Sequence, residues 1–483
     1  MININITKLL HCIPEKGSTN VDNRIVIALN IIAFLDREIS SMNGAEAAMV
    51  TKEQGEYSWA ETDTAFSRAL DHGITPFVTI DDGNELYTDI VATEPVDLYG
   101  RGPAPPTAST EAMEAWLNFV EALVTRYMDQ IKYWEIWNEP NHNGFWRPEA
   151  DAEAYSTLLR ETAILIKRID PEAQVIGGAT AGIDIEFIET FLQAGAAEYI
   201  DIITFHNYRE VVEERLYNIT DLWDVVNRYN SDIELWQGET GYPSHSSTTG
   251  ARLQSPWGVN IQAKWLLRQA LTDVHLCDAK VSNYFKLMDD DGRWEEQRRP
   301  ELTGVDSILG FPERGGARVR GVGVNEKAIL YNPSFQPKPA YYAYQNICAL
   351  LDNRYQPITI KANLEVKDQG DFYGIAYGDD AFPSVPILAP FKATTGDQYL
   401  LFYWLPWTAQ ENVINYAQVD IQIDEIPLQE PILVDLLTGR VYDIEKIQGE
   451  GNQLAFTGLP LADYPFVIAE QSEVTLTNIR NRQ

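Results

Sequence analysis

Two acidic segments carry the residue types that cleavage of a glycosidic bond requires. Residues 133–141 (YWEIWNEPN) are an apolar strand pattern that leads into an acid, Glu139, and residues 233–243 (IELWQGETGYP) place a second acid, Glu239, just beyond another strand pattern. Two carboxyls at one site can divide the reaction: one protonates the departing oxygen and the other attacks the anomeric carbon. An isolated glutamate at a strand end is more often a cap or half of an ion pair, so each acid has this structural alternative.

The elements around these acids alternate between strands and helices. Strand patterns cover residues 74–80, 132–137, 174–177, 201–206, 233–237 and 280–287, and helical periodicity covers 111–130, 151–169 and 259–275. Such alternation predicts a parallel sheet with helices packed outside it. No Gly-rich phosphate turn follows the first of these strands, so a closed (β/α)8 barrel is favoured over a dinucleotide-binding fold.

The barrel would place Glu139 where catalytic groups collect. Residues two apart on a strand face the same way, so Glu135 and Glu139 should share a face, with Glu139 at the C-terminal mouth. The last barrel helix should begin at Pro339, because proline suits the first helical turn. After about residue 355 the pattern changes to short strands, such as 398–404 and 432–440, without helical periodicity. The fold class predicted is therefore α/β, with a (β/α)8 TIM barrel over residues 1–352 and a β-sandwich over residues 353–483.

The tetrapeptide Trp137-Asn138-Glu139-Pro140 resembles the end of the fourth barrel strand in the retaining glycoside hydrolases of clan A. Its continuation through Asn141 to Phe145 and Trp146 is most similar to glycoside hydrolase family 39 and neighbouring families, over roughly residues 45–350. The resemblance implies that Glu139 is the acid/base and that Glu239, at the end of the seventh strand, is the nucleophile.

The same resemblance suggests further substrate-binding residues. Residues 201–208 (DIITFHNY) resemble the sixth strand of these enzymes, where His206 and Tyr208 would surround the nucleophile and the sugar, and Asn138 would bind the sugar 2-hydroxyl. By pattern alone, His206 is more often a core histidine and Asn138 a loop cap. Aromatic rings can stack on sugar faces, and the candidates in segments expected at the mouth are Trp146, Tyr242, Trp257 and Trp294. Any of them could be simple packing, and Trp146 is the one favoured for stacking.

Two features depart from the family or from a metal site. The arginine usual late in the second strand is not evident, and Lys52 is the nearest cation, which leaves open how the nucleophile is supported. Asp289-Asp290-Asp291-Gly292 resembles a calcium loop, but Arg293 occupies the third ligand position, so we expect a solvated acidic turn. No His-Glu-x-x-His spacing occurs among the six histidines. The prediction is chemistry with no metal and no cofactor.

Composition limits the partners. Of the 483 residues, 45% are hydrophobic and 22% charged, which predicts a folded globular protein. The formal net charge of −34 would repel phosphate backbones and anionic lipids, so neither nucleic acid nor a membrane is expected as a partner. The first residues lack the basic and apolar regions of a secretory signal, so we expect a cytoplasmic protein or one exported with its signal removed.

Together these features predict a retaining β-glycoside hydrolase that acts on a carbohydrate by double displacement through a glycosyl-enzyme intermediate. Two alternatives remain: a carbohydrate-binding barrel that has lost catalysis, and a transglycosidase, which uses the same intermediate and excludes water. The sequence leaves open the sugar, the linkage, exo or endo action, and the oligomeric state.

Overall fold

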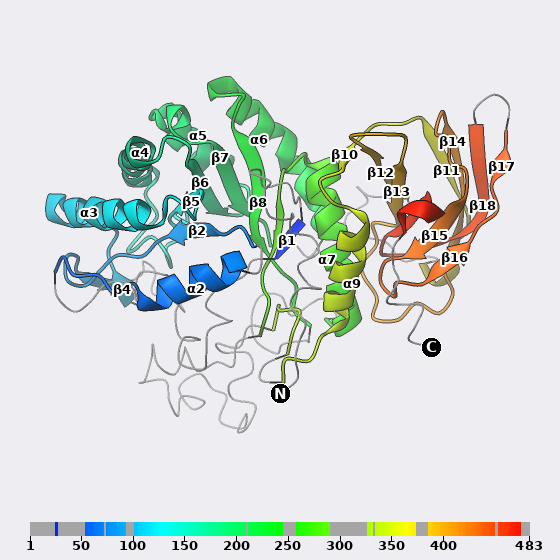
Figure 1. Ribbon diagram of the computed structural model, residues 1–483, viewed down its shortest axis with the longest axis horizontal. Helices are drawn as coiled ribbons and strands as arrows, with labels where there is room; N and C mark the ends of the chain where they lie inside the picture. Colours follow the sequence, from blue (N-terminus) through cyan, green and yellow to red (C-terminus); the bar gives the residue numbers. More distant parts are fainter. Residues whose placement is uncertain are drawn as a thin grey trace.

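The computed structural model describes residues 25–27, 54–71, 74–92, 101–208, 211–244, 257–289, 326–331, 334–372, 385–449 and 453–474. Within these ranges the chain forms two regions that lie side by side in Figure 1, an α/β barrel on the left and an antiparallel β region on the right. Helices α7 (Val259–Leu271) and α9 (Pro339–Leu350) lie between them.

The barrel region is built on a parallel sheet. Seven described strands follow the order β1-β9-β8-β7-β6-β5-β2, and every neighbouring pair is parallel. The strands are β1 (Ile25–Ile27), β2 (Phe77–Ile80), β5 (Tyr133–Ile136), β6 (Gln174–Ala181), β7 (Ile202–His206), β8 (Glu234–Thr240) and β9 (Ser282–Tyr284). Strands in chain order lie next to each other and helices cover the outside, which confirms the (β/α)8 fold class.

Five helices are described on the outside of the barrel, and three of them begin at a capping side chain. The helices on this side are α2 (Ala60–Asp71), α3 (Thr110–Tyr127), α4 (Ala152–Ile169), α5 (Ile185–Gln193) and α6 (Leu216–Tyr229). Ser109, Asp151 and Asp184 accept hydrogen bonds from backbone N–H groups in the first turns of α3, α4 and α5. A short antiparallel pair, β3 (Ile90–Ala92) and β4 (Arg101–Pro103), precedes α3. The helices predicted at 111–130 and 151–169 are therefore confirmed, with ends shifted by a few residues.

The C-terminal region is a sandwich of two antiparallel sheets. One sheet has the order β10-β12-β13-β19-β15-β16 and the other the order β11-β14-β18-β17. The bounds are β10 (Tyr355–Pro357), β11 (Ala362–Asp368), β12 (Ile387–Ala393), β13 (Tyr399–Trp404), β14 (Ala417–Asp424), β15 (Pro431–Asp435), β16 (Val441–Asp443), β17 (Ile447–Gln448), β18 (Gln453–Leu461) and β19 (Phe466–Glu470). All six residues of β13 are buried, whereas in β14 buried residues alternate with exposed or partly buried ones.

Helix α7 joins the two regions through a shared core. Its residues from Ile261 to Leu271 are all buried, and one apolar cluster runs from Trp265 on this helix to Phe402 in the sandwich. The chain passes from α9 to β10 through residues 351–354, where the expected domain boundary at 352/353 falls. None of the helices described here has a stretch that is both long and apolar enough to cross a bilayer.

Candidate active site

Strand β5 leads to Glu139 through an irregular turn. The strand ends at Ile136, after which the backbone N–H of Trp137 bonds to the carbonyl of Ile80 and that of Glu139 to the carbonyl of Ala179. Trp137 and Glu139 have backbone φ angles of 70° and 46°, in the left-handed region that residues other than glycine rarely adopt. Each such residue costs of order 1–3 kcal/mol, and such strain collects at functional sites.

This turn changes the expected relation between Glu135 and Glu139. The period-two alternation holds only while the strand stays pleated, and the two positive φ angles interrupt it. Glu135, which is 3% exposed, accepts hydrogen bonds from Thr79 (2.7 Å) and Thr204 (2.6 Å), the side chains of two other strands. It is thus held by the barrel wall, whereas Glu139 reaches a different set of partners.

Glu239 lies within β8, because the strand continues to Thr240 and is longer than predicted. The pairing of β8 with β9 shifts register between Gln237 and Thr240, so the backbone is irregular at the acid itself. A side chain at Gly238 would crowd β7: a Cβ there would lie 2.9 Å from Cβ of Thr204 and 3.3 Å from Nε2 of His206. Glycine at this position therefore allows β8 to approach the histidine closely.

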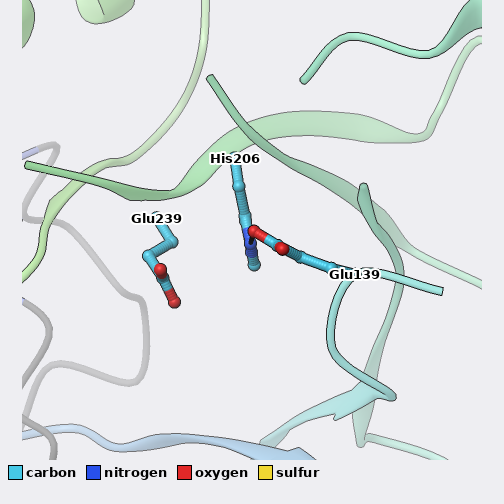
Figure 2. A group of neighbouring side chains, drawn as sticks. All are labelled: Glu139, His206 and Glu239. Carbon is cyan, nitrogen blue, oxygen red and sulfur yellow. Dashed lines mark hydrogen bonds and ion pairs between the residues drawn. The ribbon is translucent and has the colours of Figure 1, made fainter. Parts of the chain in front are cut away.

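Figure 2 shows the side chains of Glu139, from the turn after β5, His206 of β7 and Glu239 of β8 close to one another. One oxygen of each carboxylate and one ring nitrogen of His206 all lie within 4.8 Å of one another. Nδ1 of His206 lies 3.1 Å from Oε1 of Glu139, and the hydroxyl of Tyr208 donates to Oε1 of Glu239 at 2.5 Å. The structure thus brings together four residues that the sequence analysis singled out.

The charges of this group act on one another. Burial lowers the pKa of His206, but its hydrogen bond to Glu139 and the charges of Glu239, Glu139 and Glu135 outweigh burial and raise this pKa to about 9. The imidazole is therefore protonated at neutral pH and its Nδ1–H donates to Glu139. Burial and the charge of Glu139 raise the pKa of Glu239, while His206, the Tyr208 hydroxyl and Lys327 lower it.

Asp81, directly after β2, is a further acid at this end of the sheet that sequence reasoning missed. Burial raises its pKa well above the usual range, and the charges of Asp82, Glu135 and Glu239 raise it further. The group is thus neutral at pH values where an ordinary aspartate is ionised. Its position after a predicted strand was the available signal, but the strand alone does not reveal the other carboxyls that surround it.

Two of the aromatic candidates lie in the core. Trp146 and Tyr242 are each 2% exposed. Trp146 packs edge-on against Trp137, with ring centroids 5.1 Å apart, and Tyr242 stacks on Trp265 at 5.9 Å. At this exposure neither ring offers a face for a sugar, and the geometry supports packing for both.

The other candidates differ in how far the structure describes them. Asn138 is half-buried beside Glu139, and its expected contact with a sugar hydroxyl stays a prediction. Trp294 and Lys52 lie outside the described residues. Asp289, the first residue of the expected solvated acidic turn, is instead buried: it is 7% exposed and binds the ammonium of Lys338 at 2.7 Å, whereas Asp290, Asp291 and Gly292 lie outside the described residues. Burial nevertheless raises the pKa of Asp289 to about 6.

Sequence comparison connects the first half of the chain to known enzymes. Residues 44–223 match the family model for glycosyl hydrolases family 39. A beta-xylosidase of Geobacillus stearothermophilus is 32% identical over 102 residues, 19% of this chain and 20% of that protein. A beta-xylosidase of Caldicellulosiruptor saccharolyticus is 30% identical over 162 residues, 32% of this chain and 31% of that protein. The matches thus span about a fifth to a third of the length of these relatives.

Comparison of folds extends the likeness to most of the chain. A family 39 glycoside hydrolase from the gut symbiont Bacteroides cellulosilyticus superposes with a TM-score of 0.57 and 17% identity, over 88% of this chain and 73% of that one. The aligned part therefore includes the barrel and reaches into the sandwich. Residues 44–223 thus resemble the glycosyl hydrolases of family 39 in sequence, and most of the chain is similar in fold to a family 39 glycoside hydrolase.

Proposed function

We propose that this protein is a retaining β-glycosidase that works by double displacement. The observation that carries the proposal is the proximity of the two acids, whose carboxylate oxygens lie within 4.8 Å of each other. Retaining enzymes hold their carboxyls about 5–5.5 Å apart, whereas inverting enzymes need about 6.5–9.5 Å to admit a water. The short separation supports direct attack by one carboxylate.

Glu139 takes the role of acid/base in this proposal. Its Oε1 accepts the Nδ1–H of His206 at 3.1 Å, so one proton can be shared between the carboxyl and the imidazole. In the first step Glu139 gives a proton to the departing oxygen. That step leaves Glu139 as a carboxylate, which His206 stabilises, and in the second step this carboxylate accepts a proton from the attacking water.

Glu239 takes the role of nucleophile. The hydroxyl of Tyr208 donates to its Oε1, which fixes the orientation of the carboxylate and leaves Oε2 as the oxygen that attacks. Formation of the glycosyl ester removes the charge of Glu239, and the partners that stabilise the carboxylate then favour its departure. The same hydrogen bond therefore serves both the attack and the release.

The substrate proposed is a β-linked glycoside. Both curated relatives are named beta-xylosidases, which supports β-xylosides as the first compounds to assay. β-Glucosides and β-galactosides belong in the same panel, because pocket depth depends on loops that no motif specifies. Hydrolysis and transfer share the intermediate, so product analysis with added sugar acceptors separates a hydrolase from a transglycosidase.

A metal site is the competing interpretation of the cluster. Two carboxylates and an imidazole are residue types that bind metals, and because the pKa of His206 is raised, a metal ion would have to displace the proton of this imidazole to bind. Chemistry without metal remains our prediction. Activity should be unchanged after dialysis against a strong chelator, and a loss restored by a divalent cation would contradict it.

The two acids can be told apart by substitution and azide rescue. Glu139→Ala should lose about 10²- to 10⁴-fold on substrates with poor leaving groups and much less on activated aryl glycosides, because only the former need protonation. Azide should rescue this variant and give a glycosyl azide of retained configuration. Glu239→Ala should be nearly inactive on both, and azide rescue should give the inverted product.

Glu234→Ala is a matched control, since Glu234 is an exposed acid at the start of the same strand β8. It should keep full activity. If Glu139→Ala loses activity equally on good and poor leaving groups and azide restores nothing, the acid has been assigned to the wrong residue. If the unmodified protein turns over none of the panel but still binds the sugars, the alternative of a catalytically silent carbohydrate-binding barrel is favoured.

A further inference from the structure

A lysine from a distant part of the chain lies beside the candidate nucleophile. The ammonium of Lys327 is 4.9 Å from the centroid of the Tyr208 ring, and the hydroxyl of the same ring donates to Oε1 of Glu239. A cation over an aromatic face is attracted by the negative electrostatic potential of the ring. Lys327 therefore contacts the residue that orients the carboxylate.

The backbone of Lys327 is held close to the segment that follows Glu239 by a buried side-chain amide. Nε2 of Gln262 on α7, which is fully buried, lies within hydrogen-bond distance of the carbonyls of Tyr242 (2.9 Å), Lys327 (2.9 Å) and Ala328 (3.1 Å), which share its two N–H donors. One amide thus ties the lysine segment to the segment that follows Glu239. Gly241 lies close to the same segment: a Cβ there would lie 3.3 Å from Cβ of Lys327 and would clash with the carbonyl oxygen of Phe285.

The site needs a cation of this kind. The protein carries a formal charge of −34, and burial and the charge of Glu139 both raise the pKa of Glu239. Three groups lower the pKa of Glu239: the charge of His206, the Tyr208 hydroxyl and the charge of Lys327. A nucleophilic carboxylate must be ionised to attack, so these groups oppose the penalty of burial.

We propose that Lys327 is a positioning residue that stabilises the ionised carboxylate of Glu239, directly by its charge and through the phenol of Tyr208. The inference rests on the proposed function, because it assumes that Glu239 must ionise to react. It also answers the question raised by the second strand, where the expected arginine is not evident and Lys52 is the nearest cation. In this proposal Lys327, which follows β9 in the chain, supplies the positive charge that stabilises the nucleophile.

The test compares the pH dependence of kcat/KM in three proteins. Lys327→Met keeps an unbranched side chain and removes the charge, so the acid limb of the profile should move to higher pH by about 0.5–1 unit. Lys327→Arg keeps the charge and should keep the acid limb within about 0.2 unit of its original place. Lys280→Met controls for the change in net charge, since the side chain of Lys280 is partly exposed and paired with Asp278, and this variant should not shift the profile.

A second readout separates this proposal from the proposed function. Carbon NMR of protein labelled at the glutamate carboxyls follows the titration of Glu239 without any turnover, with the resonance assigned by its loss in Glu239→Gln. Lys327→Met should raise that titration midpoint even if no glycoside is cleaved. Should Lys327→Met fold poorly, Lys327→Gln serves as the neutral variant. An unchanged midpoint in a folded neutral variant, or a change in KM alone with no shift of the acid limb, would overturn the proposal.

Discussion

His206 is the residue on which the electrostatics of the site depend. Its side chain is 2% exposed, lies against Glu139, and is under the influence of the charges of Glu239 and Glu135. A buried neutral histidine would be the ordinary outcome of desolvation, but the surrounding carboxylates reverse it. The histidine thus keeps a positive charge inside a strongly acidic protein.

This charge makes stability depend on pH. The pKa of His206 rises from 6.5 to about 9 on folding, so its stabilising contribution is complete below pH 6.5 and is lost as the pH rises through about 9. We expect the difference in Tm between the native protein and His206→Gln to shrink steadily between pH 6.5 and 9. Thermal unfolding at half-unit intervals measures it, and a difference that stays constant over this window would contradict the raised pKa.

Substitutions of Trp146 distinguish a role in core packing from a role in binding the sugar. With 2% exposure and edge contacts to Trp137 and Tyr155, it belongs to the core, so Trp146→Ala should cost about 3–5 kcal/mol of unfolding free energy. Trp146→Phe should cost less and leave KM within about twofold, because no ring face is offered to the substrate. Denaturant unfolding and steady-state kinetics decide it: a large rise in KM at nearly unchanged stability would restore the stacking role.

At the scale of elements, the site depends on where strands leave their regular geometry. Ala179 on β6 has a φ angle of 44°, and the pairing of β6 with β7 shifts register in this region. The hydroxyl of Thr204 spans the irregularity: it accepts the N–H of Ala179 at 3.0 Å and donates to Oε1 of Glu135 at 2.6 Å. One buried hydroxyl therefore links β5, β6 and β7 below the catalytic candidates.

Thr204→Val should lower the free energy of unfolding, because it removes the hydroxyl that links the three strands. Valine has nearly the same shape but leaves the buried N–H of Ala179 without its acceptor and removes one donor from Glu135, so we expect a loss of about 1–3 kcal/mol. Thr204→Ser keeps the hydroxyl and serves as the control, with a smaller loss from the missing methyl. If urea unfolding gives equal stability for the valine variant and the native protein, the hydroxyl has no structural role.

At the scale of the whole molecule, the sandwich is fastened to the barrel by buried charges on one helix. Arg268 of α7 pairs with Glu213, both fully buried, and the indole N–H of Trp404 in the sandwich donates to the same glutamate at 2.8 Å. One turn earlier, Lys264 pairs with Asp463 of the sandwich. Figure 1 shows α7 between the two regions, so these pairs lie at their junction.

Breaking one of these pairs should affect the whole chain. Arg268→Met leaves the carboxylate of Glu213 buried without its cation, which costs about 3–5 kcal/mol. The double variant Glu213→Gln with Arg268→Met removes both charges and should recover much of that loss. Both regions should unfold in one transition because they share a core. Two separate transitions in the native protein, or a harmless Arg268→Met, would show that the sandwich is an independent unit.

The sequence by itself determined the local elements and the two acids. Strand and helix periodicity predicted β5, β7, α3 and α4 because the pattern of burial repeats within a few residues. The positions of Glu139 and Glu239 followed from motifs that directly adjoin their strands. The change from helical to strand texture after residue 355 predicted the sandwich for the same reason.

Only the tertiary structure decided which residues surround these acids. Thr79, Thr204, Asp81 and Lys327 meet the site from strands and loops far apart in the chain, and their contacts exist because the sheet brings its carboxyl ends together. Exposure is likewise a property of packing: Trp146 lies in a segment at the mouth, yet neighbouring rings bury it. Local sequence encodes a side chain's type and its element, whereas its partners depend on long-range contacts formed on folding.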